Sequence, residues 1–268
     1  MPEENILFGG NVPANYDRYL GPFLFEPYAR DMVNRIDATV IKDVLEIACG
    51  TGRVTRQLSN LFRKSANITA SDFSIEMVKV AERFIDNDHV RFVQADAQSL
   101  PFEDNSFDLV VCQFGFMFVP DKPKGFSEAF RVLRKGGTLL FNTWDSLENN
   151  PATEIVNKVI IDFFKGDGPL FFKIPHGLYN ASELQQLLQG AGFSNVHVQQ
   201  ISIEGTSPSA LDIAKGFVTG TPMFGELTTL DPALLEKIIN KASENVAAVF
   251  GDNPVRTPLS AWVSSAQK

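Results

Sequence analysis

The sequence predicts an α/β fold with a mostly parallel sheet, and three observations carry this prediction. Short apolar segments alternate with segments of helical periodicity between about residues 40 and 145, a pattern typical of a sheet covered by helices. A turn of small residues follows the first apolar segment. Carboxylate residues stand at the ends of the first three apolar segments, where the carboxyl edge of a parallel sheet binds ligands.

Five strands are predicted in this central region: Val40–Ile47, Ile68–Ala70, Val90–Gln94, Phe107–Cys112 and Thr138–Trp144. Helical spacing of apolar residues predicts helices after Gly52 and after Ser74, which can cap its helix. A third helix is predicted over Lys124–Arg134, with Gly136 and Gly137 ending it.

The regular alternation loosens after Trp144. We expect, in order, a helix, a long aromatic loop, a helix and a strand: Pro151–Phe164, Gly166–Tyr179, Ser182–Gly190 and Phe193–Ile203. Residues 208–250 are expected to form two helices, and Leu259–Ser264 a short final strand. The predicted domains are an N-terminal helical segment (1–36), either packed on the first strand or acting as a lid, and a main domain (37–268). Substrate-side insertions are expected at about 146–180 and 207–252.

Composition excludes several partners. The 268 residues carry a formal net charge of -8, and an acidic surface repels phosphate backbones, so nucleic acid is not expected as the main partner. No apolar stretch approaches the roughly 20 residues of a membrane-spanning helix, and the N-terminus has no signal-peptide pattern. The two cysteines, Cys49 and Cys112, lie in apolar segments, which fits buried thiols in a reducing compartment. We expect a cytoplasmic protein.

The segment from Val44 to Arg53 is the most informative one. Ala48, Gly50 and Gly52 are small enough to let a ligand approach the backbone, and the following helix start offers free N–H groups to an anion. This turn alone fits a nucleotide phosphate or an amino-acid carboxylate equally well.

Neighbouring residues favour the amino-acid carboxylate. Thr55 stands where a dinucleotide fingerprint requires a small residue. Glu46 would repel a pyrophosphate but can pair with an ammonium group. Asp72, at the end of the second strand, can accept hydrogen bonds from ribose hydroxyls, a device that NAD enzymes share. Asp96 and the Ala97 N–H match the edge of adenine, although an aspartate there can also cap a turn.

Several motifs together resemble those of class I S-adenosylmethionine-dependent methyltransferases, closest to the branch of the ubiquinone and menaquinone C-methyltransferases. The motifs are Glu46–Gly52, Ser71–Ser74, Ala95–Phe102, Ser106–Val111 and Arg131–Gly137. The resemblance implies a Rossmann-like seven-stranded sheet with an antiparallel last strand. It also implies S-adenosyl-L-methionine as cofactor and S-adenosyl-L-homocysteine as product.

The resemblance further implies a role for each matching residue. Glu46, Ala48 and Gly50 would hold the methionine end of the cofactor, with Gly52 at the helix entry. The remaining cofactor contacts would be Asp72 to the ribose, Phe73 and Met77 beside the adenosine, Asp96 and Ala97 to the adenine, and Gln113 and Phe114 beside the sulfonium. Tyr16 and Tyr19 can close over the cofactor or orient the acceptor.

Two departures from the family pattern concern the chemistry. Ala48 replaces the first glycine of the turn. Phe114 to Phe118 stand where small-molecule members often carry a histidine, so no catalytic base is assigned. No metal site is expected. His89 and His197 are interpreted as structural, and Asp145 as a turn residue.

Candidate acceptor contacts are Tyr19, Phe116, Met117 and His176, with Phe118, Phe171 and Phe172 as further apolar residues that core packing explains equally well.

The predicted function is methyl transfer to a small, apolar or aromatic acceptor by in-line displacement. A module that binds the cofactor or its product without catalysis is one alternative. An NAD-linked oxidoreductase is another, which Thr55 and Glu46 argue against. Macromolecular acceptors are disfavoured by the acidic charge. The sequence does not determine the acceptor, the methylated atom or the oligomeric state.

Overall fold

The computed structural model describes residues 10–85, 87–164, 171–228 and 232–268. Residues 166–170 of the predicted aromatic loop therefore lie outside the described residues, as does the start of the N-terminal segment. The chain forms two compact units. A sheet unit contains Tyr28–Asp145, Pro175–Ile201 and Ala261–Lys268, and a helical unit contains Met1–Pro27, Ser146–Ile174 and Ser202–Ser260.

Seven strands form one sheet, in the order β3-β2-β1-β4-β5-β7-β6. Their bounds are β1 Asp43–Ile47, β2 Asn67–Asp72, β3 Val90–Gln94, β4 Phe107–Gln113, β5 Leu133–Trp144, β6 Ser194–Ser207 and β7 Val255–Gln267. The first five strands pair in parallel, whereas β7 is antiparallel to β5. The predicted Rossmann-like sheet with an antiparallel last strand is confirmed.

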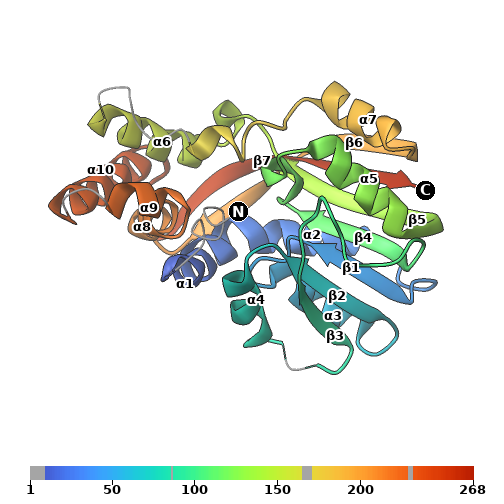
Figure 1. The fold of residues 1–268 in the computed structure, drawn as a ribbon. Coiled ribbons are helices and arrows are strands. Elements are labelled where there is room, and N and C mark those ends of the chain that lie inside the picture. Colours follow the sequence, from blue (N-terminus) through green and yellow to red (C-terminus); the bar gives the residue numbers. More distant parts are fainter. Residues whose placement is uncertain (1–9, 86, 165–170, 229–231) are drawn as a thin grey trace. The chain divides into compact units, whose positions relative to one another are not determined.

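Helices cover both faces of the sheet unit. In Figure 1, α2 (Glu26–Asn34), α3 (Arg53–Phe62) and α4 (Ile75–Glu82) lie on one face, and α5 (Lys122–Val132) and α7 (Ala181–Gly190) on the other. Apolar side chains of α2 and α3 pack with those of β1, β2, β4, β5 and β7 into one core: Ala29, Met32, Val44, Val54, Leu58, Phe62, Ile68, Leu109, Val111, Leu140 and Val263. Ser74 caps α4 as predicted, because its hydroxyl accepts from the Met77 N–H.

The helical unit holds α1 (Val12–Asn15), the π-helix η2 (Tyr16–Phe25), α6 (Pro151–Phe163), α8 (Ala210–Thr219), α9 (Met223–Thr228) and α10 (Pro232–Phe250), with short 3₁₀ turns η4 (Leu147–Asn149) and η5 (Phe171–Lys173). The prediction of two helices within residues 208–250 is wrong, because the described part of this segment forms three. α8 and η2 pack closely, since a Cβ on Gly216 would lie 2.6 Å from Leu20 Cδ2.

The glycine pair at the start of β5 corrects a second prediction. Helix α5 ends at Val132, and Gly136 and Gly137 lie inside β5 instead of ending the helix. The β4–β5 register shifts between Phe107 and Leu109. Gly136 has a φ of +79°, and a Cβ on Gly137 would lie 2.9 Å from the Arg134 carbonyl oxygen. The glycines therefore lie at an irregularity of the β4–β5 pairing, where residues 134–137 of β5 stand opposite Asp108 alone.

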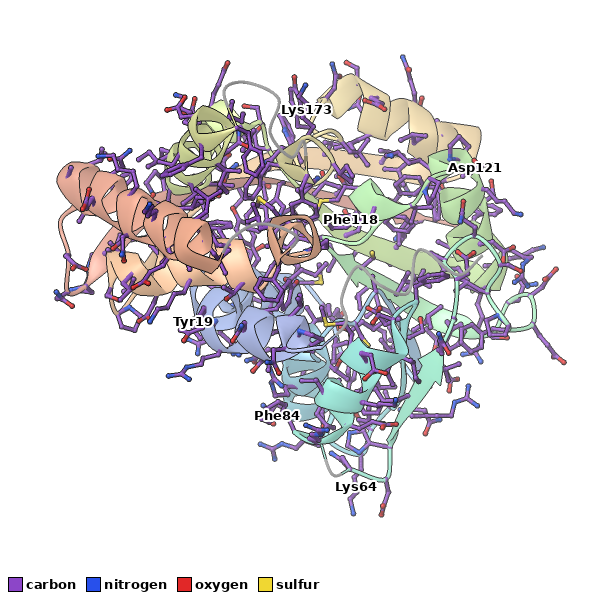
Figure 2. The ribbon with its side chains drawn as sticks, turned by 60° about the vertical axis from the view of Figure 1, so that its left-hand side comes forward. Tyr19, Lys64, Phe84, Phe118, Asp121 and Lys173 are labelled. Carbon is purple, nitrogen blue, oxygen red and sulfur yellow. The ribbon has the colours of Figure 1, made fainter. Side chains whose placement is uncertain are left out.

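The helix predicted after Ser74 ends at Glu82, before Phe84 and Ile85, whose apolar side chains continue its helical spacing. Phe84 follows the end of α4 and its side chain is 56% exposed, projecting at the surface in Figure 2. The Arg56 guanidinium lies over its ring, 5.1 Å from the ring centroid. Among the described residues, no helix is long and apolar enough to cross a membrane.

Candidate active site

The turn between β1 and α3 is built from alternating left-handed residues. Ala48, Gly50 and Gly52 have φ values of 56°, 55° and 81°, a conformation that glycine adopts freely and alanine only with strain. Gly52 also lacks room for a side chain, because a Cβ would lie 3.0 Å from Ala81 Cβ. A Cβ on Gly50 would meet nothing within 4 Å. Alternation of this kind aims backbone N–H groups into a concavity that suits an anion.

Glu46 lies beneath this turn with 1% of its surface exposed. Its Oε2 accepts a hydrogen bond of 2.6 Å from the Thr55 hydroxyl in the first turn of α3. Burial raises the Glu46 pKa to about 8, against the opposing effect of Thr55. A buried carboxyl of this kind favours either a proton or a cationic partner.

Asp72 joins the second strand to the same turn. Its Oδ2 accepts from the Gly50 N–H and its Oδ1 from the Ser74 N–H, both at 2.8 Å. Burial raises the Asp72 pKa, and these two N–H groups oppose the rise. A carboxylate has about four lone-pair sites, so both oxygens can still accept from ligand hydroxyls. The structure thus brings Glu46, Gly50 and Asp72 together as the sequence predicts.

The residues predicted to contact the adenosine differ in exposure. Phe73 is 42% exposed, whereas Met77 is buried. β3 ends at Gln94, and Asp96 follows it in a turn, where its Oδ1 accepts from the Gln98 N–H at 2.8 Å. The turn-capping interpretation of Asp96 therefore holds for Oδ1, and the Gln98 side-chain amide also donates to both oxygens, at 3.2 and 3.4 Å. The role of Asp96 toward adenine, like that of Ala97, stays a prediction.

An aromatic cluster follows β4. Phe114 has a φ of 53°, and its N–H donates to the backbone oxygen and the Oδ1 of Asn142, at 3.1 and 3.0 Å. Its ring stacks on Trp144 with centroids 3.7 Å apart. Tyr28 packs edge-on against Phe114 and Trp144, at 5.3 and 5.5 Å. Gln113, the other residue predicted beside the sulfonium, is the last residue of β4.

Gly115 brings this cluster against the β1–α3 turn. A Cβ on Gly115 would lie 2.5 Å from Ala48 Cβ and 2.6 Å from Cys112 Sγ, so only glycine fits. Sequence reasoning missed Gly115, Asn142 and Trp144 as residues that build the site. The motif pattern gives no signal for them, because their role depends on contacts between separate strands.

Phe116 and Met117 are buried in the 3₁₀ turn η3 (Phe116–Phe118). Phe116 stacks on Phe126 at 4.3 Å and packs edge-on against Phe141 at 5.4 Å. These contacts favour core packing over the predicted acceptor contact. Phe118 is 40% exposed and is labelled in Figure 2.

Four further candidates lie in the helical unit. Tyr16 stacks on Phe25 with centroids 4.6 Å apart, and the Arg18 guanidinium lies over the Tyr19 ring at 5.1 Å. Phe172 is buried against Phe217, and Phe171 packs on Phe172. Contacts of these residues with cofactor or acceptor stay predictions.

Asp145 and His176 form a buried polar pair behind Trp144. Asp145 accepts from the Trp262 and Gln200 side chains, so it links β5 to β6 and β7 and is more than the turn residue that the sequence suggests. The Asp145 carbonyl lies 2.6 Å from His176 Nδ1. Since a carbonyl only accepts, Nδ1 carries the proton. Burial lowers the His176 pKa to about 4, so the imidazole is neutral at pH 7.

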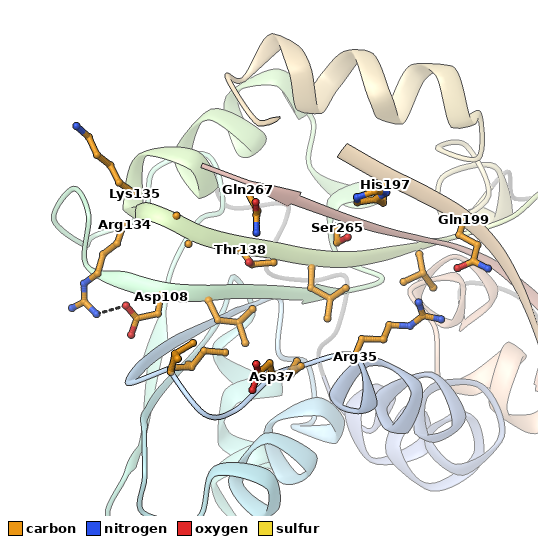
Figure 3. Close-up of a pocket in the computed structure, with 18 residues that line it drawn as sticks. Arg35, Asp37, Asp108, Arg134, Lys135, Thr138, His197, Gln199, Ser265 and Gln267 are labelled. Atoms are coloured by element: carbon orange, nitrogen blue, oxygen red, sulfur yellow. Dashed lines mark hydrogen bonds and ion pairs between the residues drawn. The ribbon is translucent and has the colours of Figure 1, made fainter. Parts of the chain in front are cut away.

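The two remaining histidines lie elsewhere. His89 precedes β3, and both ring nitrogens are buried without a hydrogen-bond partner among the described residues. His197 lines a cavity of about 500 Å³ (Figure 3). Asp108 and Arg134, near the amino ends of β4 and β5, also line it. This cavity therefore opens at the edge of the sheet opposite to the glycine turn. Within the described ranges, no cluster of three or more His, Cys, Asp or Glu residues could hold a metal ion.

Comparison with known proteins identifies the family of this chain. Residues 45–141 match a family model described as a methyltransferase domain. The chain is 32% identical over 212 residues to a demethylmenaquinone methyltransferase of Staphylococcus aureus (strain JH9), an alignment covering 72% of this chain and 86% of that protein.

Two solved structures share the fold. A putative methyltransferase from Bacillus halodurans C-125 has a TM-score of 0.56 at 23% identity, covering 90% of this chain and 98% of that one. A phosphoethanolamine N-methyltransferase 2 from Haemonchus contortus, solved with S-adenosyl-L-methionine, has a TM-score of 0.59 at 16% identity, covering 95% of this chain and 56% of that one.

Sheet order, glycine turn and sequence relatives define a methyltransferase. The chain belongs to the class I S-adenosylmethionine-dependent methyltransferases, and its cofactor is S-adenosyl-L-methionine. The residues present fit this cofactor. The buried Glu46 carboxyl can pair with its ammonium group, and the N–H groups of the left-handed turn can bind its carboxylate.

Proposed function

We propose that the acceptor is a small apolar molecule of aromatic or quinone-like type. The observation that carries this proposal is the 32% identity to a demethylmenaquinone methyltransferase over most of both chains. The formal net charge of -8 supports a small molecule over a nucleic acid. The two buried free thiols, Cys49 and Cys112, fit a reducing compartment and favour a cytoplasmic location.

We assign the cofactor to the carboxyl edge of β1, β2 and β3. Glu46 binds the ammonium, the Ala48–Gly52 turn binds the carboxylate, and Asp72 binds the ribose. The hydrogen bonds that already fix Glu46 and Asp72 support this assignment. Asp96 and Ala97 read the adenine edge, and Phe73 and Met77 flank the adenosine.

The bound cofactor supplies a methyl group on a sulfonium, which an acceptor takes by in-line displacement while the C–S electron pair passes to sulfur. The chain contributes alignment and exclusion of water. Phe114, held by Asn142 and Trp144, forms an apolar wall beside the sulfonium. His176, neutral and anchored through Nδ1, is a positioning residue of this wall. An aromatic acceptor such as a phenol or hydroquinone can pack against these rings, and its proton passes to the solvent, because no base is assigned at this wall.

We further propose that the helical unit selects the acceptor. It contains the predicted insertions at 146–180 and 207–252 almost entirely, together with Tyr16 and Tyr19. The alternative is a module that binds the cofactor without turnover, and it predicts no release of S-adenosylhomocysteine with any acceptor.

The test is an acceptor screen that measures S-adenosylhomocysteine release by the purified protein. The panel contains reduced demethylated naphthoquinones, small phenols, a phosphorylated amine, a protein mixture and RNA. We expect turnover with the first two classes, and Asp72→Ala serves as the inactive control. Turnover only with RNA or protein would overturn the proposed acceptor class. Parallel titrations with S-adenosylmethionine, S-adenosylhomocysteine and NAD should show binding of the first two alone.

A further inference from the structure

We propose that Thr55 is a positioning residue for the cofactor's ammonium group, because its hydroxyl holds the Glu46 carboxyl in place as the acceptor. This inference rests on the proposed role of Glu46. Thr55 itself touches no part of the cofactor and acts through Glu46 alone.

Thr55 is fully buried in the first turn of α3. Its hydroxyl donates to Glu46 Oε2 at 2.6 Å, and its backbone N–H also acts on the same carboxyl. The N-cap of α3 is Gly52, which has no side chain to cap the helix. Glu46, from the end of β1, therefore takes the place of a capping side chain. One residue thus supplies a side-chain and a backbone donor, which together fix the carboxyl.

The described charged groups around Glu46 act on it without forming an ion pair. Asp72, at the end of β2, disfavours the charged carboxylate, whereas Arg56, one residue beyond Thr55 in α3, favours it. The buried thiols of Cys49 and Cys112 have raised pKa values and stay neutral. Among the described residues, no Lys or Arg forms an ion pair with Glu46 within 4.0 Å. The carboxyl therefore has a protein donor and lacks a protein cation.

This arrangement couples cofactor binding to a proton. The pKa of about 8 means that Glu46 carries a proton at pH 6.5 in the cofactor-free protein. The arriving ammonium favours the carboxylate, so the proton leaves Glu46 for the solvent. The Thr55 hydroxyl favours the charged form. Removing this hydroxyl therefore weakens the binding of S-adenosylmethionine most at a pH where Glu46 of the cofactor-free protein is protonated. The loss is smallest at a pH where Glu46 is ionised both before and after binding.

The experiment is calorimetric titration with S-adenosylmethionine at pH 6.5 and pH 9, in two buffers of different ionisation enthalpy at each pH. We expect the wild type to release close to one proton at pH 6.5. In Thr55→Val the affinity should fall about tenfold at pH 6.5, the scale of one hydrogen bond to a charged group, and stay within about threefold of wild type at pH 9. Thr55→Ser keeps the hydroxyl and should match the wild type at both values.

Two controls separate the possible failures. Glu46→Gln cannot release a proton, and it provides the baseline for titration of the cofactor's own amine. If Glu46→Gln binds like the wild type, the proposed ammonium site is wrong. If Glu46→Gln binds weakly but Thr55→Val and Thr55→Ala lose the same affinity at both pH values, or none, the inference about Thr55 alone is wrong. Thr55→Ala replaces Thr55→Val should the valine variant not fold.

Discussion

The two halves of the sheet's carboxyl edge are built in different ways. At the ends of β1 and β2, short polar contacts link Glu46, Gly50, Thr55 and Asp72, which lie within one βαβ stretch of the chain. At the ends of β4 and β5, stacked rings link Tyr28, Phe114 and Trp144, which come from three distant segments. The first region presents hydrogen-bonding groups for the proposed cofactor contacts, and the second presents an apolar surface of stacked rings.

Both regions contain a strained residue, and the two regions approach each other closely at Gly115. Ala48 and Phe114 have positive φ values of 56° and 53°, a conformation that costs roughly 1–2 kcal/mol for a residue with a side chain. Such strain persists where surrounding contacts determine the backbone. Asn142 supplies two of those contacts at Phe114. We expect the polar contacts to set the affinity for the cofactor and the aromatic region to set the stability of this edge of the sheet.

The largest effect is expected in the polar region. In the proposed cofactor site, Asp72→Ala would remove two charge-assisted hydrogen bonds to the ribose, worth about 1.5–3 kcal/mol each. The affinity for S-adenosylmethionine should therefore fall about a hundredfold or more, as measured by calorimetry. Asp43→Ala, at the opposite end of β1, should bind like the wild type. Unchanged affinity in Asp72→Ala would mean that the ribose assignment is wrong.

The next largest effect is expected in the aromatic region. Trp144→Ala removes the ring that stacks on Phe114 and receives the edge of Tyr28. We expect the free energy of unfolding to fall by about 3–5 kcal/mol, measured by chemical denaturation. Trp144→Phe keeps a ring and should lose less than half of that amount. Equal losses in the two variants would show that stacking contributes nothing here.

These two regions also explain which features the sequence predicts. Glu46, Gly50 and Asp72 follow from local patterns, since Glu46 and Asp72 stand at the ends of recognisable strands and Gly50 in the small-residue turn after the first one. The irregular pairing at Gly136 and Gly137 does not, because the same pair can end a helix or bend a strand, and only pairing with β4 decides. Phe116 shows the same limit, because an apolar residue after β4 can face a ligand or the core. Burial against Phe126 and Phe141 depends on α5 and β5.

The junction of the two regions should be sensitive to a single methyl group. In Gly115→Ala the new Cβ would lie 2.5 Å from Ala48 Cβ, so the glycine turn or the aromatic cluster must move. Overpacking of this kind costs about 1–3 kcal/mol of stability, and cofactor affinity should fall as well. Thermal unfolding and calorimetry measure both. Gly190→Ala, where a Cβ meets nothing within 4 Å, is the matched control.

The smallest effect concerns the pH dependence of stability. The His176 pKa is about 4 in the folded protein, below its ordinary value of 6.5. Because the unfolded chain binds this proton first, the contribution of His176 is present above pH 6.5 and is lost as pH falls toward 4. The free energy of unfolding should fall by about 1 kcal/mol between pH 7 and pH 5.5 through this group. His176→Asn keeps a donor for the Asp145 carbonyl but does not titrate. Chemical denaturation at both pH values should therefore show a smaller loss of unfolding free energy in the variant than in the wild type. An equal loss in the two proteins would mean that a group other than His176 is responsible.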